Sequence, residues 1–169
     1  LELSHEFDYL GWLFGTPAWV IAHTSKQSAL EIDVEDSAHI LFGGNLGAES
    51  LGLVGALSMD LLRRDKTRYC SVIGEEGTLR WDGVRGSVEL FRNEKTGWST
   101  LLSRPDDVAS SYPAQWAHFL DCIDDRATPL VTLQDAYRTL VVVDACRDSA
   151  SADRRVDIVP NSQFGHKAP

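Results

Sequence analysis

Apolar residues near the start of the chain recur at helical spacing. Four of them stand three or four positions apart: Leu3, Phe7, Leu10 and Phe14. This period predicts that one side of a helix packs inward. Ser4 and the acids after it are typical of a helix start, and Gly15 followed by Pro17 is typical of a helix end. We therefore predict a helix over residues 4–14.

The period changes to two in the middle of the chain, which predicts strands. The alternating segments are residues 38–42, 49–61, 69–73, 78–81 and 87–91, with a further strand near 98–102. Turn signals at Gly43–Asn45, Glu75–Gly77 and Asp82–Gly83 separate neighbours, so these strands are predicted to pair antiparallel. The 49–61 segment has large apolar residues on one parity and small or polar residues on the other. We expect one sheet face to pack under helices and the other against a second subunit or domain.

The helical period then returns. Four residues of the next segment follow helical spacing: Trp116, Phe119, Leu120 and Ile123. We place Pro113 in the first turn of that helix, where a proline is tolerated. Thr132 and Asp135 resemble a capping box that opens another helix, and residues 155–159 read as a short last strand.

This element order predicts the fold class. A helix, several antiparallel strands, two helices and one strand make an α+β domain, with an open, mostly antiparallel β-sheet and helices packed on one face. We expect one domain over residues 1–159, followed by a flexible tail at 160–169.

Composition narrows the possible partners. The 169 residues carry a net charge of −9, which argues against binding to nucleic acid or anionic membranes. No apolar run approaches the length of a transmembrane helix, and 43% hydrophobic residues suffice for a core. The widely spaced Cys70, Cys122 and Cys146 are typical of reduced thiols, so a cytoplasmic protein is expected.

The sharpest chemical feature lies in the first predicted helix. His5, Asp8 and Trp12 share one helix face at i, i+3 and i+7. A carboxylate can set the tautomer and pKa of such a histidine, which would suit it as an acid or base beside a sugar ring. The alternative is a first-turn histidine that only contacts nearby acids. The other histidines lack metal-ligand spacing, so no metal site is expected.

Four segments together resemble one known family. Residues 1–15, LELSHEFDYLGWLFG, resemble the opening of the C-terminal domain of the Gfo/Idh/MocA family, the relatives of glucose–fructose oxidoreductase and inositol dehydrogenase. Residues 34–38, 68–79 and 132–136 resemble further family segments in the same order. The resemblance spans residues 1–159.

The resemblance implies a function. Members of the Gfo/Idh/MocA family are two-domain dehydrogenases in which a Rossmann domain binds NAD or NADP and the second domain completes a carbohydrate site. By this match His5 exchanges the proton of a sugar, nucleotide-sugar or inositol hydroxyl, and Asp8 orients the helix or the histidine. Tyr9 and Trp12 would contact the substrate. The Rossmann domain would precede this chain and is absent from it.

Two departures from the family pattern matter. Leu1 stands where the family often has Asp. Either Glu2, one position away, takes over the supporting role, or the pair of acid and histidine is incomplete. No G-x-G-x-x-G follows a predicted strand, so the chain alone is expected to bind no NAD(P) and to be inactive.

Two other functions stay open. The chain could be a non-catalytic module for sugar binding or dimerisation, or part of a glycoside hydrolase that uses bound NAD. The sequence does not specify the substrate or choose between NAD and NADP. The expected partners are a carbohydrate, the Rossmann domain of the same protein, and a second copy that forms a homodimer through the sheet.

Overall fold

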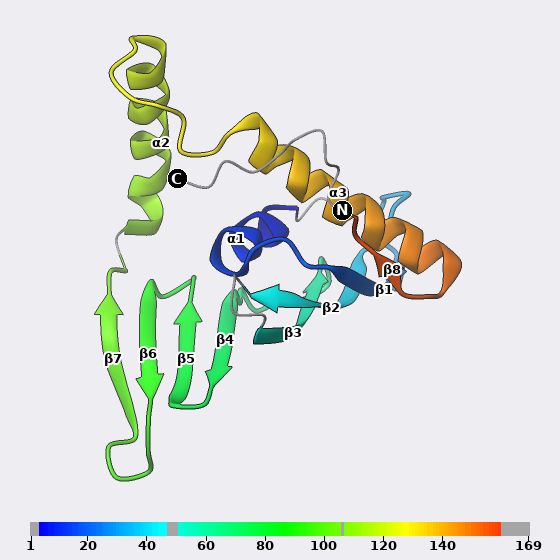
Figure 1. Cartoon of the computed structure of the whole chain (residues 1–169), viewed down its shortest axis with the longest axis horizontal. Coiled ribbons are helices and arrows are strands. Elements are labelled where there is room, and N and C mark those ends of the chain that lie inside the picture. Colours follow the sequence, from blue (N-terminus) through cyan, green and yellow to red (C-terminus); the bar gives the residue numbers. More distant parts are fainter. Residues whose placement is uncertain (1–3, 47–50, 106, 160–169) are drawn as a thin grey trace. The chain divides into compact units, whose positions relative to one another are not determined.

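The computed structural model describes residues 4–46, 51–105 and 107–159. Within them it has three helices and eight strands, and the chain divides into two compact units (Figure 1). The first unit is Leu1–Leu62 with Val131–Pro169, and the second is Arg63–Leu130. The predicted α+β fold class is confirmed, with the strands divided between two four-stranded antiparallel sheets.

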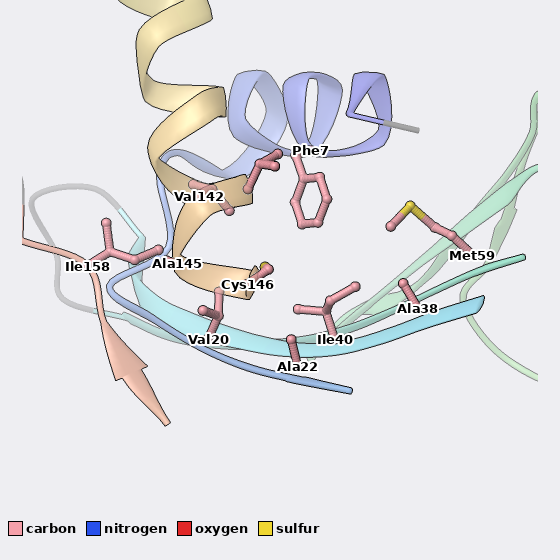
Figure 2. Packing of buried hydrophobic residues seen from close by; sticks show 11 residues of the cluster. Phe7, Val20, Ala22, Ala38, Ile40, Met59, Val142, Ala145, Cys146 and Ile158 are labelled. Carbon is pink, nitrogen blue, oxygen red and sulfur yellow. The ribbon is translucent and has the colours of Figure 1, made fainter. Parts of the chain in front are cut away.

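The first unit is a sheet with two helices on one face (Figures 1 and 2). Its elements are α1 (His5–Phe14), β1 (Trp19–Ser25), β2 (Ser37–Leu46), β3 (Leu51–Asp60), α3 (Leu133–Ala152) and β8 (Val156–Asp157). The strand order is β3-β2-β1-β8. Helix α3 packs on β1 and β8, and α1 packs on α3.

The core of this unit lies between the sheet and the helices (Figure 2). Its buried apolar side chains are Phe7, Val20, Ala22, Ala38, Ile40, Met59, Val142, Val143, Ala145, Cys146 and Ile158. Alternate residues of β1 and β2 point into it, as the period of two predicts. Burial raises the pKa of the Cys146 thiol to about 12, so this cysteine stays protonated and packs as a small apolar residue.

One buried hydroxyl joins α3 to the sheet. Ser149 is fully buried, and its Oγ accepts a hydrogen bond of 2.9 Å from the backbone N–H of Ala22 in β1. The same hydroxyl donates to the carbonyl oxygen of Arg154 at 2.6 Å. The Ser149 hydroxyl therefore both accepts and donates a hydrogen bond, which allows this polar side chain to lie in an apolar core.

The loop between β1 and β2 is organised by a buried carboxylate. Asp36 accepts hydrogen bonds from the backbone N–H groups of Gln27 and Ser28 and from the Ser28 hydroxyl, at 2.6–2.9 Å. The Ser28 hydroxyl is the main cause that holds the pKa of Asp36 below its ordinary value, against the opposing effect of burial. The two backbone donors and the charge of Lys26 add to the lowering.

The lowered pKa predicts a stability that depends on pH. A carboxyl with a lower pKa when folded stabilises the fold above its unfolded pKa of about 3.9, and loses that contribution as pH falls through the folded value. Asp36→Asn should therefore lower Tm at pH 7, and the difference from wild type should shrink below about pH 4. Asp33→Asn, an exposed neighbour in the same loop, should leave Tm nearly unchanged. A difference for Asp36→Asn that is constant down to pH 2 would contradict this account.

The second unit contains the other sheet and one helix. Its elements are β4 (Tyr69–Gly74), β5 (Gly77–Asp82), β6 (Ser87–Phe91), β7 (Trp98–Ser103) and α2 (Asp107–Ile123). The strands follow chain order as a meander, with a register shift at Val88/Glu89. The guanidinium of Arg80 lies 4.1 Å from the ring centre of Trp98, a cation–π packing contact between β5 and β7.

Two sequence predictions about the elements are wrong, and one strand was missed. The Gly43–Asn45 segment is not a turn but part of β2, because its glycines admit close neighbours. A Cβ on Gly43 would lie 2.4 Å from the Trp19 ring, and one on Gly44 would lie 2.9 Å from the backbone nitrogen of Ala18. Strand β1 was not predicted, because Trp19 and Ile21 on its outer face hide the alternation with its buried residues.

The second wrong prediction concerns Pro113, which lies inside α2 and not in its first turn. The helix begins at Asp107, in a segment whose serines give no apolar period. The predicted helix starts at 4 and 132 agree with the structure to within one residue, and Thr132 and Asp135 form the capping box.

Among the described helices, none is both long enough and apolar enough to cross a membrane. The predicted tail at 160–169 lies outside the described residues.

Candidate functional site

Helix α1 presents one side to the core and another to solvent. Phe7 is buried against α3 and the sheet, which fixes the rotation of the helix (Figure 2). The His5 side chain is 56% exposed and Trp12 is 83% exposed. His5 and Trp12 stand seven positions apart, so they lie on the same side of the helix. Tyr9 is half-buried between them in the chain.

The helix ends where the sequence predicts. Gly15 has a positive φ of 80°, and its N–H donates to the carbonyl oxygen of Gly11. Ser4 precedes the first helical residue, but its side chain makes no capping hydrogen bond. The buried Phe7, rather than an N-cap, therefore anchors the start of α1.

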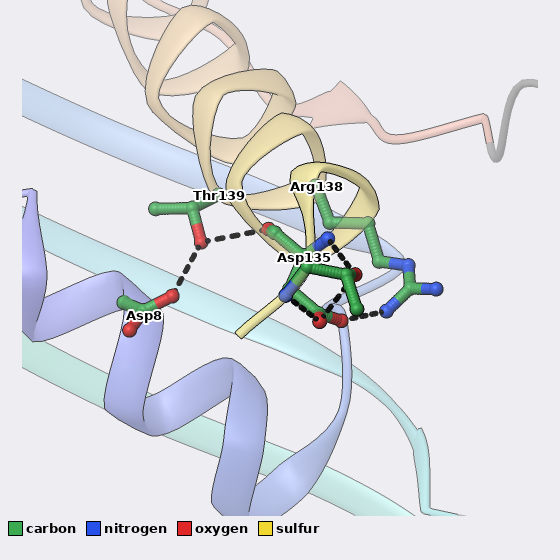
Figure 3. Close-up of polar contacts among 5 residues, drawn as sticks. Asp8, Asp135, Arg138 and Thr139 are labelled. Atoms are coloured by element: carbon green, nitrogen blue, oxygen red, sulfur yellow. Dashed lines mark hydrogen bonds and ion pairs between the residues drawn. The ribbon is translucent and has the colours of Figure 1, made fainter. Parts of the chain in front are cut away.

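Asp8 links α1 to α3 (Figure 3). Its Oδ1 accepts a hydrogen bond of 3.2 Å from the hydroxyl of Thr139. That hydroxyl also lies 3.3 Å from the carbonyl oxygen of Asp135, whose side chain caps α3 and pairs with Arg138 at 2.6 Å. Asp8 therefore joins α1, the helix that carries His5, to α3.

The carboxylate beside His5 is Glu6. The Nε2 atom of His5 lies 3.1 Å from Oε1 of Glu6, a side chain that is only 12% exposed. Asp8 takes no part in this contact, since its carboxylate accepts a hydrogen bond from Thr139. Glu2, the other predicted supporting residue, lies outside the described residues.

Sequence reasoning missed both contacts for different reasons. Thr139 is 131 positions from Asp8, and nothing in the α3 sequence marks it as a partner. Glu6 was visible only as a first-turn acid. Side chains at adjacent helix positions do not normally face each other, so spacing gave no reason to pair it with His5.

The closely spaced glycines of the described strands lie within a strand or between two strands. A dinucleotide cofactor needs a glycine-rich turn that leads from a strand into a helix. Gly43 and Gly44 lie within β2, and Gly83 and Gly86 lie in the turn between β5 and β6. In the three described ranges, no group of three or more histidine, cysteine, aspartate or glutamate side chains could hold a metal ion.

The pattern of one protein family matches residues 2–158, nearly the whole chain. It is described as the oxidoreductase family, C-terminal alpha/beta domain, of the Gfo/Idh/MocA proteins. The chain belongs to the Gfo/Idh/MocA family. The family predicted from four short segments is thereby confirmed. A search of curated proteins found no match.

Solved structures of Gfo/Idh/MocA type share the fold. The WlbA dehydrogenase from Bordetella pertussis, in complex with NADH and UDP-GlcNAcA, is 21% identical with a TM-score of 0.71, and the match covers 95% of this chain and 47% of that one. A levoglucosan dehydrogenase in complex with NADH is 18% identical with a TM-score of 0.76, covering 94% and 49%. An Agrobacterium radiobacter oxidoreductase, in complex with NAD+, L-tartaric acid and magnesium, is 22% identical with a TM-score of 0.70, covering 92% and 47%. This chain thus spans about half the length of the structures it resembles.

Proposed function

We propose that this chain is the substrate-binding half of an NAD(P)-dependent dehydrogenase that acts on a hydroxyl-bearing carbon of a sugar, nucleotide sugar or inositol. The observation that carries the proposal is the solvent-facing side of α1, where the exposed His5 and Trp12 stand on a helix anchored by Phe7. NADH with a sugar or sugar derivative appears in similar structures, including that of WlbA with UDP-GlcNAcA.

In this proposal His5 is the acid/base. Histidine suits this role because an ordinary imidazole, with a pKa of about 6.5, exchanges protons near neutral pH. The imidazole takes the hydroxyl proton when the alcohol is oxidised and returns it when the carbonyl is reduced. The cofactor, held by a Rossmann domain outside this chain, supplies the hydride chemistry. This chain alone is therefore proposed to be inactive.

The other residues of α1 bind and orient. Trp12 offers an exposed aromatic face on which a sugar ring can stack, and Tyr9 lies one helical turn from His5. The link from Asp8 to Thr139 keeps α1 fixed on α3. Because catalysis depends on placement to within about 1 Å, this link holds the imidazole in position for the hydroxyl.

The test is a reduction assay of NAD+ and NADP+ by the protein that carries this chain together with a dinucleotide-binding domain. Sugars, inositols and UDP-sugars are offered as substrates. Net formation of NADH or NADPH supports a dehydrogenase and excludes a hydrolase that only transiently oxidises its substrate. Turnover of none of these classes, by protein that demonstrably binds the cofactor, contradicts the proposal and favours the non-catalytic module.

We further propose a homodimer through the outer face of the first sheet, the face opposite α1 and α3. Ile21, Leu41 and Ala56 are register partners across β1, β2 and β3 on this face. Ile21 is 41% exposed and Leu41 is 47% exposed, and the row beside them holds His23, His39 and Ser58, with no carboxylate, lysine or arginine. A flat apolar face of this kind is typical of an interface.

Leu41→Arg should break the dimer, because it places a charge in the centre of the proposed interface. Light scattering at a fixed micromolar concentration should show a fall from the dimer mass to the monomer mass. Ile73→Arg makes the same kind of change at an exposed position of β4 and should leave the mass unchanged. A wild-type chain that is monomeric at this concentration would contradict the interface.

A further inference from the structure

The contact between His5 and Glu6 is unusual for neighbours in a helix. Side chains at adjacent positions point about 100° apart, so the 3.1 Å distance requires that both turn toward each other. The Glu6 carboxylate is largely withdrawn from water, whereas the imidazole is more than half exposed. A carboxylate in that position favours hydrogen-bond donors, and Nε2 of His5 lies within hydrogen-bond distance of its Oε1.

The chemistry of the two groups decides where the histidine carries its hydrogen. An ionised carboxylate only accepts hydrogen bonds, so the nitrogen that faces it must donate. When Nε2 of a neutral imidazole is the donor, Nδ1 holds the lone pair. The contact therefore favours the Nε2–H tautomer and leaves Nδ1 of His5 as the basic nitrogen.

We infer that Glu6 is the positioning residue for His5: its carboxylate holds the imidazole in the Nε2–H tautomer, so that Nδ1 exchanges the proton with the substrate hydroxyl. This inference rests on the proposed role of His5. In the oxidation, the alcohol gives its hydroxyl proton to Nδ1 and the electron pair of its C–H bond, as hydride, to the oxidised nicotinamide. The resulting imidazolium is then stabilised by the carboxylate that still faces Nε2–H.

Asp8 is the alternative partner, and the structure assigns it elsewhere. It lies at i+3 from His5, the spacing at which helical side chains do meet. Its Oδ1, however, accepts from the hydroxyl of Thr139 in α3 (Figure 3). The two acids of α1 thus have different roles: Asp8 holds the helix against α3, and Glu6 orients the imidazole of His5.

The first arm of the test is a nitrogen-15 NMR spectrum of the histidine side chains in the 169-residue chain near neutral pH, which reports the tautomer directly and needs no cofactor. We expect the Nε2–H pattern for His5 in wild type. Glu6→Gln should keep that pattern, because its amide oxygen accepts from the same nitrogen. Glu6→Leu, similar in size but without an acceptor, should show a mixture like that of the exposed His23. Glu31→Leu, which removes an exposed carboxylate from the β1–β2 loop, should match wild type.

Two results of this arm overturn the inference. One is a wild-type His5 that carries its hydrogen on Nδ1. The other is a Glu6→Leu spectrum identical to wild type. If Glu6→Leu does not fold, the wild-type tautomer still decides the first of these.

The second arm is steady-state kinetics of the whole enzyme. We expect Glu6→Leu to lower kcat by about 10-fold with little change in KM. Glu6→Gln, which keeps an acceptor oxygen, should retain most of the wild-type kcat. Equal losses in kcat for the two variants overturn the inference. If His5→Ala itself leaves turnover intact, the proposed role of His5 fails. The NMR spectra still decide separately whether Glu6 sets the tautomer of His5.

Discussion

Replacing His5 by alanine should lower the turnover of the whole dehydrogenase by about 10²–10⁴-fold, the usual contribution of a positioned acid/base group. The fold should survive, because the His5 side chain is more than half exposed and lies outside the buried core. Hydride transfer without a group to take the hydroxyl proton would leave an unfavourable charge on the oxygen, so the loss should appear in kcat rather than only in KM. The measurement is the initial rate of NADH or NADPH formation at saturating cofactor.

His23→Ala is the matched control for this experiment. His23 is also an exposed histidine of the first unit, but it stands on β1 and its ring belongs to the outer sheet face. Its replacement should change turnover by less than about 2-fold, since it stands on the sheet face opposite α1. Equal turnover of His5→Ala and His23→Ala, with unchanged Tm in both, would remove His5 from the active site. The assignment of the family and the fold would remain.

The sequence was informative where one local signal agreed with another. The ends of α1 follow from Gly15 and from the apolar period around Phe7, and the start of α3 follows from Thr132 and Asp135. Each of these signals lies within a few residues of the helix end that it predicts. Local chemistry decides these features, so no knowledge of distant contacts is needed.

The errors arose where distant residues decide the local structure. Gly43 reads as a turn until the Trp19 ring is known to lie over it. Strand β1 is hidden because both its faces carry apolar residues, one for the core and one exposed. A strand with two apolar faces loses the alternation on which strand prediction depends.

The candidate site shows the same limit. The helix face that carries His5, Asp8 and Trp12 could be predicted from their spacing alone. Spacing favoured Asp8 as the partner of His5, but Thr139 takes that carboxylate from a helix 131 positions away in the sequence. Asp8 is engaged there, and among the described residues Glu6 is the acid that lies beside the imidazole. The partner of a candidate catalytic group thus depended on a contact between helices that no local pattern records.

The second large effect concerns the core that holds α1 in place. Ile40 is 2% exposed in the inner strand β2, below Phe7 and beside Cys146 (Figure 2). Ile40→Ala should lower the free energy of unfolding of the first unit by about 2–5 kcal/mol, because it removes buried methyl groups and leaves a cavity that a sheet cannot close. Urea unfolding followed by circular dichroism measures the change.

Leu133→Ala provides the comparison, since it removes a side chain of similar size from a position of α3 that is 82% exposed. It should change the free energy of unfolding by no more than about 0.5 kcal/mol. Ile40 belongs to the first of the two compact units, so the loss for Ile40→Ala should appear in the transition of that unit. If both variants cost the same, the sheet and helices of the first unit do not pack as described. If only Ile40→Ala is costly, the anchoring of Phe7, and with it the placement of His5, rests on that packed core.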